Sequence, residues 1–187
     1  MSGMNYHWGK FMTAMEKFTL AGGCFWCLDS AYIQLKGISD VTCGYAGGHD
    51  PNPNYESVCN GTTGHAEVVS IEFDPEVISS EVILDVFFTV HDPTQLNRQG
   101  HDIGTQYRSA MFYETPEQRE LFENGVAKAN EVWGGRVVTE IAELDKFYPA
   151  EEYHQDYFAN NPTQGYCAAV VAPKVGKVRQ SFAHLVK

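Results

Sequence analysis

The residue of this sequence best placed for nucleophilic chemistry is a cysteine directly behind two glycines. Cys24 follows Gly22 and Gly23 in the stretch AGGCFWCLDSAY, and apolar side chains recur at helical spacing from Phe25 onward. The free N–H groups and the positive dipole end of a helix start stabilise a thiolate. The glycines allow a tight turn that leaves the sulfur exposed. We therefore expect Cys24 to be a reactive thiol of low pKa rather than a small core residue.

A second cysteine three positions later leaves other readings open. Cys27 completes a Cys-x-x-Cys spacing, which occurs in disulfide oxidoreductases and in zinc sites. Phe25 and Trp26 lack the turn-forming character expected between the cysteines of an oxidoreductase, and a zinc site would need a second clustered pair. The spacing favours a packing or auxiliary role for Cys27; a thiol–disulfide oxidoreductase and a metal-binding or redox-sensing module are the alternatives. The remaining cysteines are scattered: Cys43, Cys59 and Cys167.

A carboxyl group on the inner face of a strand is the candidate acid. Residues 66–75, AEVVSIEFDP, alternate so that Glu67 shares one face with Val69, Ile71 and Phe73. An inward carboxylate is costly unless it is protonated or well hydrogen-bonded. We expect Glu67 to be an acid of raised pKa. An exposed carboxylate at a sheet edge is the alternative.

Two aromatic residues beside Cys24 could form an apolar pocket. Sulfur contacts aromatic rings favourably, so Phe25 and Trp26 would suit a thioether or methyl-sulfur substrate. An aromatic pair at a helix start is more often part of the core.

The elements that must position these residues follow the order β-α-β-β-α-β-α-β. This order predicts an α+β fold: a two-layer sandwich with a split βαβ (ferredoxin-like) core, an extra helix and strand, and long functional loops. Strands are expected at 18–23, 41–48, 66–75, 107–113 and 137–144, with helices from Cys24 to Gly37, from Ser79 or Ser80 to Val90, from Thr115 to Trp133 and from Glu151 to Phe158. Residues 49–64 and 91–106 are expected to be loops, and the tail after Pro162 to be irregular, with a possible strand at 167–171.

Composition limits the partners and the compartment. The 187 residues carry 13 Lys plus Arg against 24 Asp plus Glu, a net charge of −11 that disfavours nucleic acid and anionic membrane surfaces. The apolar runs are too short to span a bilayer, and the N-terminus lacks the pattern of a secretory signal. Five irregularly spaced cysteines are typical of thiols in a reducing compartment, so we expect a cytoplasmic protein. Residues 1–16 are expected to be a weakly ordered extension and 17–187 a single catalytic domain.

Seven ordered motifs together resemble one family. From about Phe18 to the C-terminus, the chain is similar to peptide methionine sulfoxide reductase A. The motifs that carry the resemblance are GCFWC, GYAGG, TGHAE, HDPT, QGHDIGTQYRS, EEYHQDYF and NPTQGYC.

The resemblance implies a thiol-dependent reduction of methionine S-sulfoxide, free or in proteins, and hence repair of oxidised proteins. Cys24 would be the nucleophile that becomes a sulfenic acid, and Glu67 the acid. Tyr45 and Tyr107 would hydrogen-bond the sulfoxide oxygen. The residues that would bind the rest of the substrate are Phe25, Trp26, Asp102 and Tyr166.

The resemblance also implies how the thiol is regenerated. Cys167 would resolve the sulfenic acid to a Cys24–Cys167 disulfide, which thioredoxin would reduce, with no cofactor or metal. Many family members carry a further cysteine in a glycine-rich tail, and this chain ends without one. Cys27 occupies a position that is often glycine, so a Cys24–Cys27 bridge is the alternative, although it would strain a helix start.

Overall fold

The structure, a computed structural model, describes residues 13–187. Residues 1–12 of the expected N-terminal extension therefore lie outside the described residues. The first strand begins at Glu16. Among residues 13–187, no helix combines the length and apolar character needed to cross a membrane.

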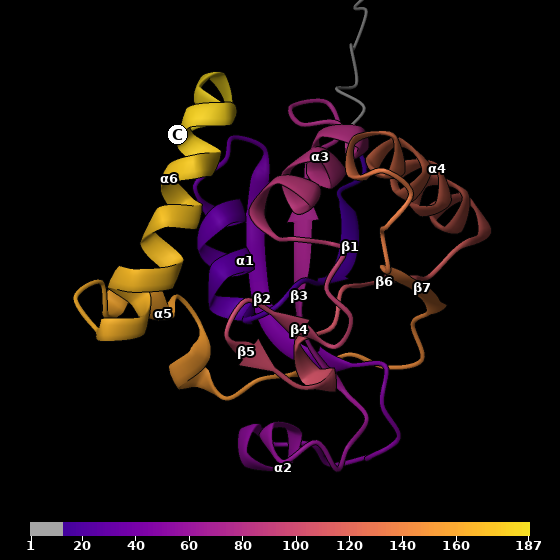
Figure 1. The fold of residues 1–187 in the computed structure, drawn as a ribbon. Helices are drawn as coiled ribbons and strands as arrows, with labels where there is room; N and C mark the ends of the chain where they lie inside the picture. Colours follow the sequence, from indigo (N-terminus) through magenta and orange to yellow (C-terminus); the bar gives the residue numbers. More distant parts are fainter. Residues whose placement is uncertain (1–12) are drawn as a thin grey trace, which may run out of the picture.

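A six-stranded mixed sheet forms the centre of an α+β fold (Figure 1). The strand order is β7-β6-β1-β3-β2-β8, and every neighbouring pair is antiparallel except β6 and β7. The strands are β1 (Glu16–Ala21), β2 (Ile38–Ala46), β3 (Ala66–Phe73), β6 (Ala110–Tyr113), β7 (Glu140–Glu143) and β8 (Tyr148–Pro149).

Four helices of nine residues or more pack around this sheet. Helix α1 contacts β2 and β3, α3 contacts both α1 and α4, and α6 contacts both α1 and α3. These helices are α1 (Phe25–Ile33), α3 (Ser80–Val90), α4 (Pro116–Trp133) and α6 (Ala172–Ser181). The shorter elements are α2 (Tyr55–Cys59), β4 (Arg98–Gln99), β5 (Asp102–Ile103), α5 (Tyr157–Asn160), the 3₁₀ turns η1 (Thr105–Tyr107), η2 (Glu152–His154) and η4 (Ala183–Leu185), and the π-helical turn η3 (Cys167–Val171).

The two faces of the central strands carry side chains of different size. Large residues such as Phe18 and Ile71 point to the side where α1 and α3 pack, and they join the main core. The opposite face carries small residues such as Ala46 and Ala66, which Leu144 and other residues between β7 and β8 cover. Burial on both faces explains why β3 is almost entirely buried along its length.

Local signals in the sequence set the ends of the helices as expected. The Thr115 hydroxyl accepts the Gln118 N–H (3.1 Å), Pro116 takes the first helical position, and Gly134 ends α4 with a φ of +66°. Ser79 caps α3 in the same way through the Val82 N–H. The helices expected at 79/80–90 and 115–133 are confirmed.

The C-terminal tail is helical, so the expectation of an irregular tail with a strand at 167–171 is wrong. Residues 167–171 form η3, and α6 continues from it. Cys167, Val171, Val175 and Val178 are all buried at spacings of four, four and three residues, which is a helical stripe. Pro173 and Gly176 obscure that stripe in the sequence; Pro173 lies in the first turn of α6, directly after the π-helical turn η3.

Three other segments differ from what the sequence indicated. The loop at 49–64 holds α2, which Asn54 and Ser57 cap reciprocally. The loop at 91–106 holds the β4–β5 hairpin. The helix expected from Glu151 to Phe158 is two short elements, because Asp156 adopts a φ of +51° between them.

Candidate active site

Cys24 stands at the junction of β1 and α1. It is the N-cap residue of α1, with φ −60° and ψ 127°, and its carbonyl accepts the Cys27 N–H (3.1 Å). Gly23 has a φ of +86°, and a Cβ there would lie 2.8 Å from the Gln99 side chain, so glycine is required at this position. The tight turn into a helix is therefore confirmed.

Burial of Cys24 opposes the expectation of an exposed, low-pKa thiol. Its relative exposure is 8%. Burial raises the pKa of the Cys24 thiol well above its usual value, and hydrogen bonding to Cys27 and the charge of Glu67 raise it further. The expectation of a low pKa is wrong, because desolvation of the buried thiol outweighs the effect of the helix N-terminus.

Glu67 lies on the inner face of β3 and is buried. Its exposure is 1%, and its Oε2 accepts the backbone N–H of Phe25 (3.0 Å), directly after Cys24. Burial raises the pKa of Glu67 to about 8, against the lowering effect of that hydrogen bond. The carboxyl group is thus protonated at neutral pH and beside the thiol, as expected for an acid.

Tyr45 lies directly opposite Glu67 across the β2–β3 pair. The Tyr45 hydroxyl donates to Glu151 Oε2 (3.1 Å), and the Tyr55 N–H donates to Glu151 Oε1 (3.1 Å). The charge of Glu67 contributes to a raised pKa of Tyr107, a half-buried residue in η1, which contacts β3. Both tyrosines expected at the site are therefore close to Glu67.

Phe25 and Trp26 join a cluster of aromatic rings. Trp26 stacks on Tyr157 with centroids 3.8 Å apart and an interplanar angle of 6°. Its Nε1 donates to His154 Nδ1 (3.2 Å), and the Phe25 ring lies 5.0 Å from the same imidazole. Phe25 also lies 5.8 Å from Tyr45, so the rings border the region where Tyr45 and Glu67 lie.

Hydrogen bonds set the tautomer of His154. Because Nδ1 accepts from Trp26, the proton is on Nε2, which faces Glu151 Oε2 at 3.3 Å. Burial lowers the pKa of His154, which favours the neutral imidazole, against the opposite effect of Glu151. Glu151 therefore accepts from the Tyr45 hydroxyl and lies beside the imidazole that orients Trp26, although His154 Nε2 makes no hydrogen bond within residues 13–187.

Asp102 and Tyr166 bring the β4–β5 hairpin against the C-terminal segment. The Tyr166 hydroxyl donates to Asp102 Oδ2 (2.5 Å), and the Tyr166 ring lies edge-on to Trp26 at 5.9 Å. Two expected substrate-binding residues from distant parts of the chain thus meet beside Trp26.

Cys167 is fully buried in η3, directly after Tyr166. Its N–H donates to Gln164 Oε1 (2.9 Å). Burial raises the pKa of its thiol, and the negative charge of Cys27 raises it further. Cys167 therefore lies near Cys27, in the same buried cluster as Cys24.

The structure adds polar and aromatic residues that the sequence analysis did not single out. Glu151, His154 and Tyr157 all belong to the stretch EEYHQDYF, and Tyr55 comes from α2. The density of titratable and aromatic residues in that stretch was a signal that it belongs to the site. Their partners could not be read from the sequence, because Glu151 and Tyr45 are 106 residues apart.

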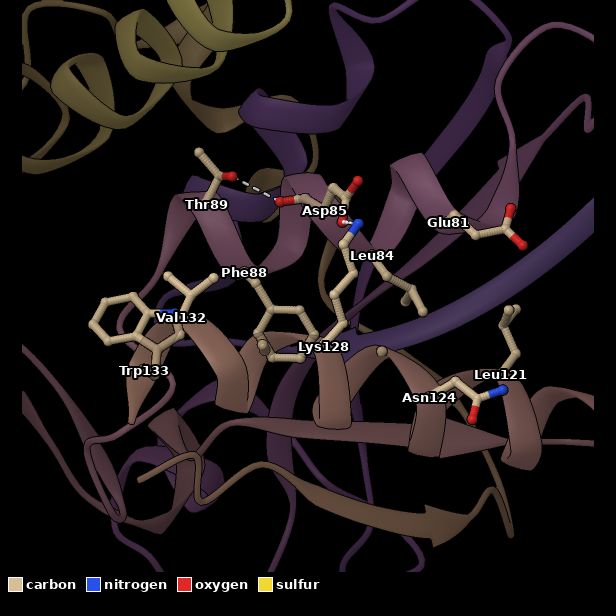
Figure 2. Close-up of a pocket in the computed structure, with 12 residues that line it drawn as sticks. Glu81, Leu84, Asp85, Phe88, Thr89, Leu121, Asn124, Lys128, Val132 and Trp133 are labelled. Carbon is tan, nitrogen blue, oxygen red and sulfur yellow. Dashed lines mark hydrogen bonds and ion pairs between the residues drawn. The ribbon is translucent and has the colours of Figure 1, made fainter. Parts of the chain in front are cut away.

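A separate pocket lies between α3 and α4, with a volume of about 410 Å³ (Figure 2). Phe88, Leu121 and Trp133 line it, and the Lys128–Asp85 ion pair (2.7 Å) crosses it. None of the candidate site residues borders this pocket, so it is not where the chemistry of Cys24 would occur. Within residues 13–187, no group of three or more His, Cys, Asp or Glu side chains is arranged to hold a metal ion.

Comparison with known proteins is consistent with this arrangement of residues. Residues 16–186 match the family model for peptide methionine sulfoxide reductase. A relative from Clavibacter michiganensis subsp. michiganensis, named peptide methionine sulfoxide reductase MsrA, is 59% identical over 173 residues, covering 92% of this chain and 99% of that protein.

Solved structures share the fold. The reduced form of Mxr1 from Saccharomyces cerevisiae has a TM-score of 0.78 at 38% identity, covering 84% of this chain and 91% of that one. Mxr1 in complex with Trx2 has a TM-score of 0.55 at 26% identity, covering 76% and 84%. With a buried acid beside a cysteine at a helix start, and a match over nearly the whole chain, the protein belongs to the peptide methionine sulfoxide reductase A family.

Proposed function

We propose that this enzyme reduces methionine sulfoxide with Cys24 as nucleophile and Glu67 as acid. The observation that carries the assignment is the buried Glu67 carboxyl, which accepts the Phe25 N–H at 3.0 Å and has a pKa of about 8. In the reaction the Cys24 sulfur bonds to the sulfoxide sulfur while Glu67 protonates the sulfoxide oxygen. Oxygen transfer then gives methionine, and Cys24 is oxidised to a sulfenic acid.

The surrounding residues suit the S-sulfoxide, free or in a peptide. Phe25 and Trp26 supply an apolar wall for the methyl group. Tyr45 and Tyr107 supply hydroxyl groups for the sulfoxide oxygen, on the side where Glu67 lies. Asp102, which accepts from Tyr166, would bind the main chain of the substrate.

Regeneration would use Cys167 and thioredoxin. Cys167 takes the oxidised state of Cys24 as an intramolecular Cys24–Cys167 disulfide, and reduced thioredoxin returns both to thiols. The proximity of Cys167 to Cys27, one turn from Cys24, supports this pairing. The complex of the similar Mxr1 with Trx2 supports thioredoxin as the reductant. No cofactor or metal takes part in these steps.

The same reasoning extends to the organisation and location of the protein. Residues 17–187 would be one catalytic domain. The order β6-β1-β3-β2 of the four central strands supports a split βαβ, ferredoxin-like core in a two-layer sandwich. All five cysteines are free thiols, which supports a reducing, cytoplasmic location. Repair of oxidised proteins is the role that such an activity would serve there.

Thiol trapping after one turnover tests the assignment. The protein is mixed with methionine sulfoxide and no reductant, then alkylated, digested and analysed by mass spectrometry. We expect methionine and a peptide that links Cys24 to Cys167. Loss of both products in Cys24→Ser is the matching control, and methionine formed by Cys24→Ser would refute the assignment. Stoichiometric zinc in the purified enzyme would instead favour a metal-binding module.

A further inference from the structure

Cys27 is a buried thiol of the site that the proposed reaction leaves without a role. Its N–H donates to the Cys24 carbonyl (3.1 Å), and its exposure is 1%. The two thiols are close enough for each to shift the pKa of the other. Cys167 belongs to the same buried cluster, where η3 packs against α1. Cys24 and Cys27 are thus joined through the backbone at the start of α1, and Cys167 lies close enough to Cys27 for the Cys27 charge to raise its pKa.

The groups around Cys27 favour its thiolate. Hydrogen bonding with the Cys24 thiol lowers the pKa of Cys27, and the charge of Lys174 and the Tyr166 hydroxyl lower it further, against burial and the charge of Asp102. Burial raises the pKa of the other two thiols, Cys24 and Cys167. Of the three thiols, Cys27 is therefore the one best able to attack an oxidised sulfur.

We propose that Cys27 is the first resolving thiol, which captures the Cys24 sulfenic acid as a Cys24–Cys27 disulfide before Cys167 becomes oxidised. The proposal rests on the proposed function, because methionine sulfoxide must first oxidise Cys24. Cys27 Sγ bonds to Cys24 Sγ and the Cys24 S–O bond breaks; the oxygen leaves as water with its own proton and the proton of the Cys27 thiol. Cys24 is reduced from sulfenic acid to disulfide, and Cys27 is oxidised from thiol to disulfide.

The backbone at Cys24 makes this bond accessible. A disulfide needs Cβ atoms about 3.5–4.5 Å apart, whereas positions three apart on a helix lie about 5–6 Å apart. Cys24 is the N-cap, with an extended ψ of 127°, so its side chain can move toward Cys27 without breaking the hydrogen bonds inside α1. The strain expected for a bridge at a helix start is reduced for this reason.

A thiol exchange then delivers the disulfide to Cys167. The Cys167 sulfur bonds to Cys24 Sγ, the Cys24–Cys27 bond breaks, Cys27 leaves with the electron pair, and the proton lost by the Cys167 thiol passes to Cys27. A thiol of lower pKa is the better leaving group, so the same charges that favour attack by Cys27 favour its release. The exchange ends in the Cys24–Cys167 disulfide, with no net change in oxidation state.

Rapid-quench trapping of the full-length enzyme separates the steps. One equivalent of a methionine sulfoxide peptide is added without reductant; methionine, dimedone-trapped sulfenic acid and disulfide-linked peptides are quantified over time. In Cys167→Ser we expect the Cys24–Cys27 disulfide to accumulate. In Cys27→Ser and Cys27→Ala we expect the methionine burst within about twofold of wild type and the sulfenic acid to persist at least about tenfold longer. Cys59→Ser, a cysteine in α2, is the matched control and should follow wild type.

Other outcomes overturn the proposal. A Cys167→Ser variant that accumulates sulfenic acid without a Cys24–Cys27 disulfide would remove Cys27 from the sequence of steps. So would formation of Cys24–Cys167 at the wild-type rate in either Cys27 variant. Absence of methionine from wild-type enzyme would instead refute the proposed function, so the two failures are distinguishable. Because two replacements of Cys27 are tested and the methionine burst reports folding, a misfolded variant cannot be mistaken for slow resolution.

Discussion

Replacement of Glu67 by glutamine tests the acid directly. Glutamine keeps the shape of the side chain and an oxygen that can accept the Phe25 N–H, which Glu67 now accepts at 3.0 Å. It removes the one proton that a carboxyl of pKa about 8 can give at neutral pH. Positioned general acids contribute about 10²–10⁴-fold, so we expect the methionine burst to slow by that factor while the KM changes little.

The same replacement should slow the reaction but raise the stability of the folded protein at high pH. The folded-state pKa of Glu67 is raised from 4.5 to about 8, so the folded protein binds the proton more tightly than the unfolded chain. Stability is then complete below pH 4.5 and falls as the pH rises toward 8. The shift corresponds to a loss of about 3 kcal/mol at pH 7 and about 5 kcal/mol at pH 9. Glu67→Gln should abolish that loss and be more stable than wild type at pH 9.

Single-turnover methionine release and denaturant unfolding at pH 5, 7 and 9 measure both effects. Glu72→Gln is the matched control, because Glu72 lies on the same strand, is only partly buried and pairs with Lys17 at 3.9 Å. It should change the rate by less than twofold and the stability by about 0–1 kcal/mol. A Glu67→Gln variant with the wild-type rate would show that Glu67 is structural. A wild-type stability that does not fall between pH 5 and 9 would refute the burial argument.

Three further changes test residues around the site and the core. Glu151 accepts from the Tyr45 hydroxyl (3.1 Å) and from the Tyr55 N–H (3.1 Å), whereas glutamine in Glu151→Gln accepts through one oxygen only. We expect kcat/KM to fall about tenfold in steady-state assays. An unchanged value would contradict a role for Glu151 in holding Tyr45. Tyr166→Phe removes the donor to Asp102, so the KM for a peptide sulfoxide should rise about tenfold with kcat nearly constant; a fall in kcat alone would oppose a binding role. His91 is buried with a pKa lowered to about 4, so wild-type stability should decline by about 3 kcal/mol as the pH falls from 6.5 toward 4, and urea unfolding of His91→Gln should lack that step.

Sequence patterns predicted the parts of the fold whose signals are local. The capping of α4 by Thr115 and Pro116, and the inward position of Glu67 on β3, depend on spacings within a few residues. Helix α6 was missed because its packing against α1 and α3 decides its structure, and Pro173 and Gly176 weaken its intrinsic propensity.

The sequence singled out candidate residues that the structure brings close together, but it did not predict their electrostatics. A helix start next to Cys24 indicated a stabilised thiolate, yet the pKa of that thiol depends on burial by segments far away in the chain. Glu151 could not be foreseen as a partner of Tyr45, because β8 and the turn after it must first be placed beside β2. Long-range packing sets both properties, and a single sequence carries little direct information on it.

The charges at the site explain why a raised pKa at Cys24 is compatible with nucleophilic attack. Negative charge on Glu67 raises the pKa of Cys24, and charges on Asp102 and Cys27 raise the pKa of Glu67, so several of these groups cannot be ionised together. A low-pKa Cys24 would place a thiolate beside Glu67 at rest. Because burial raises both pKa values, Cys24 and Glu67 keep their protons until substrate arrives. As Cys24 attacks, Glu67 can give its proton to the sulfoxide oxygen, and the proton that the Cys24 thiol loses can return to the Glu67 carboxylate. The site then does not hold a thiolate and a carboxylate side by side, an arrangement that a buried site with few cations could not sustain.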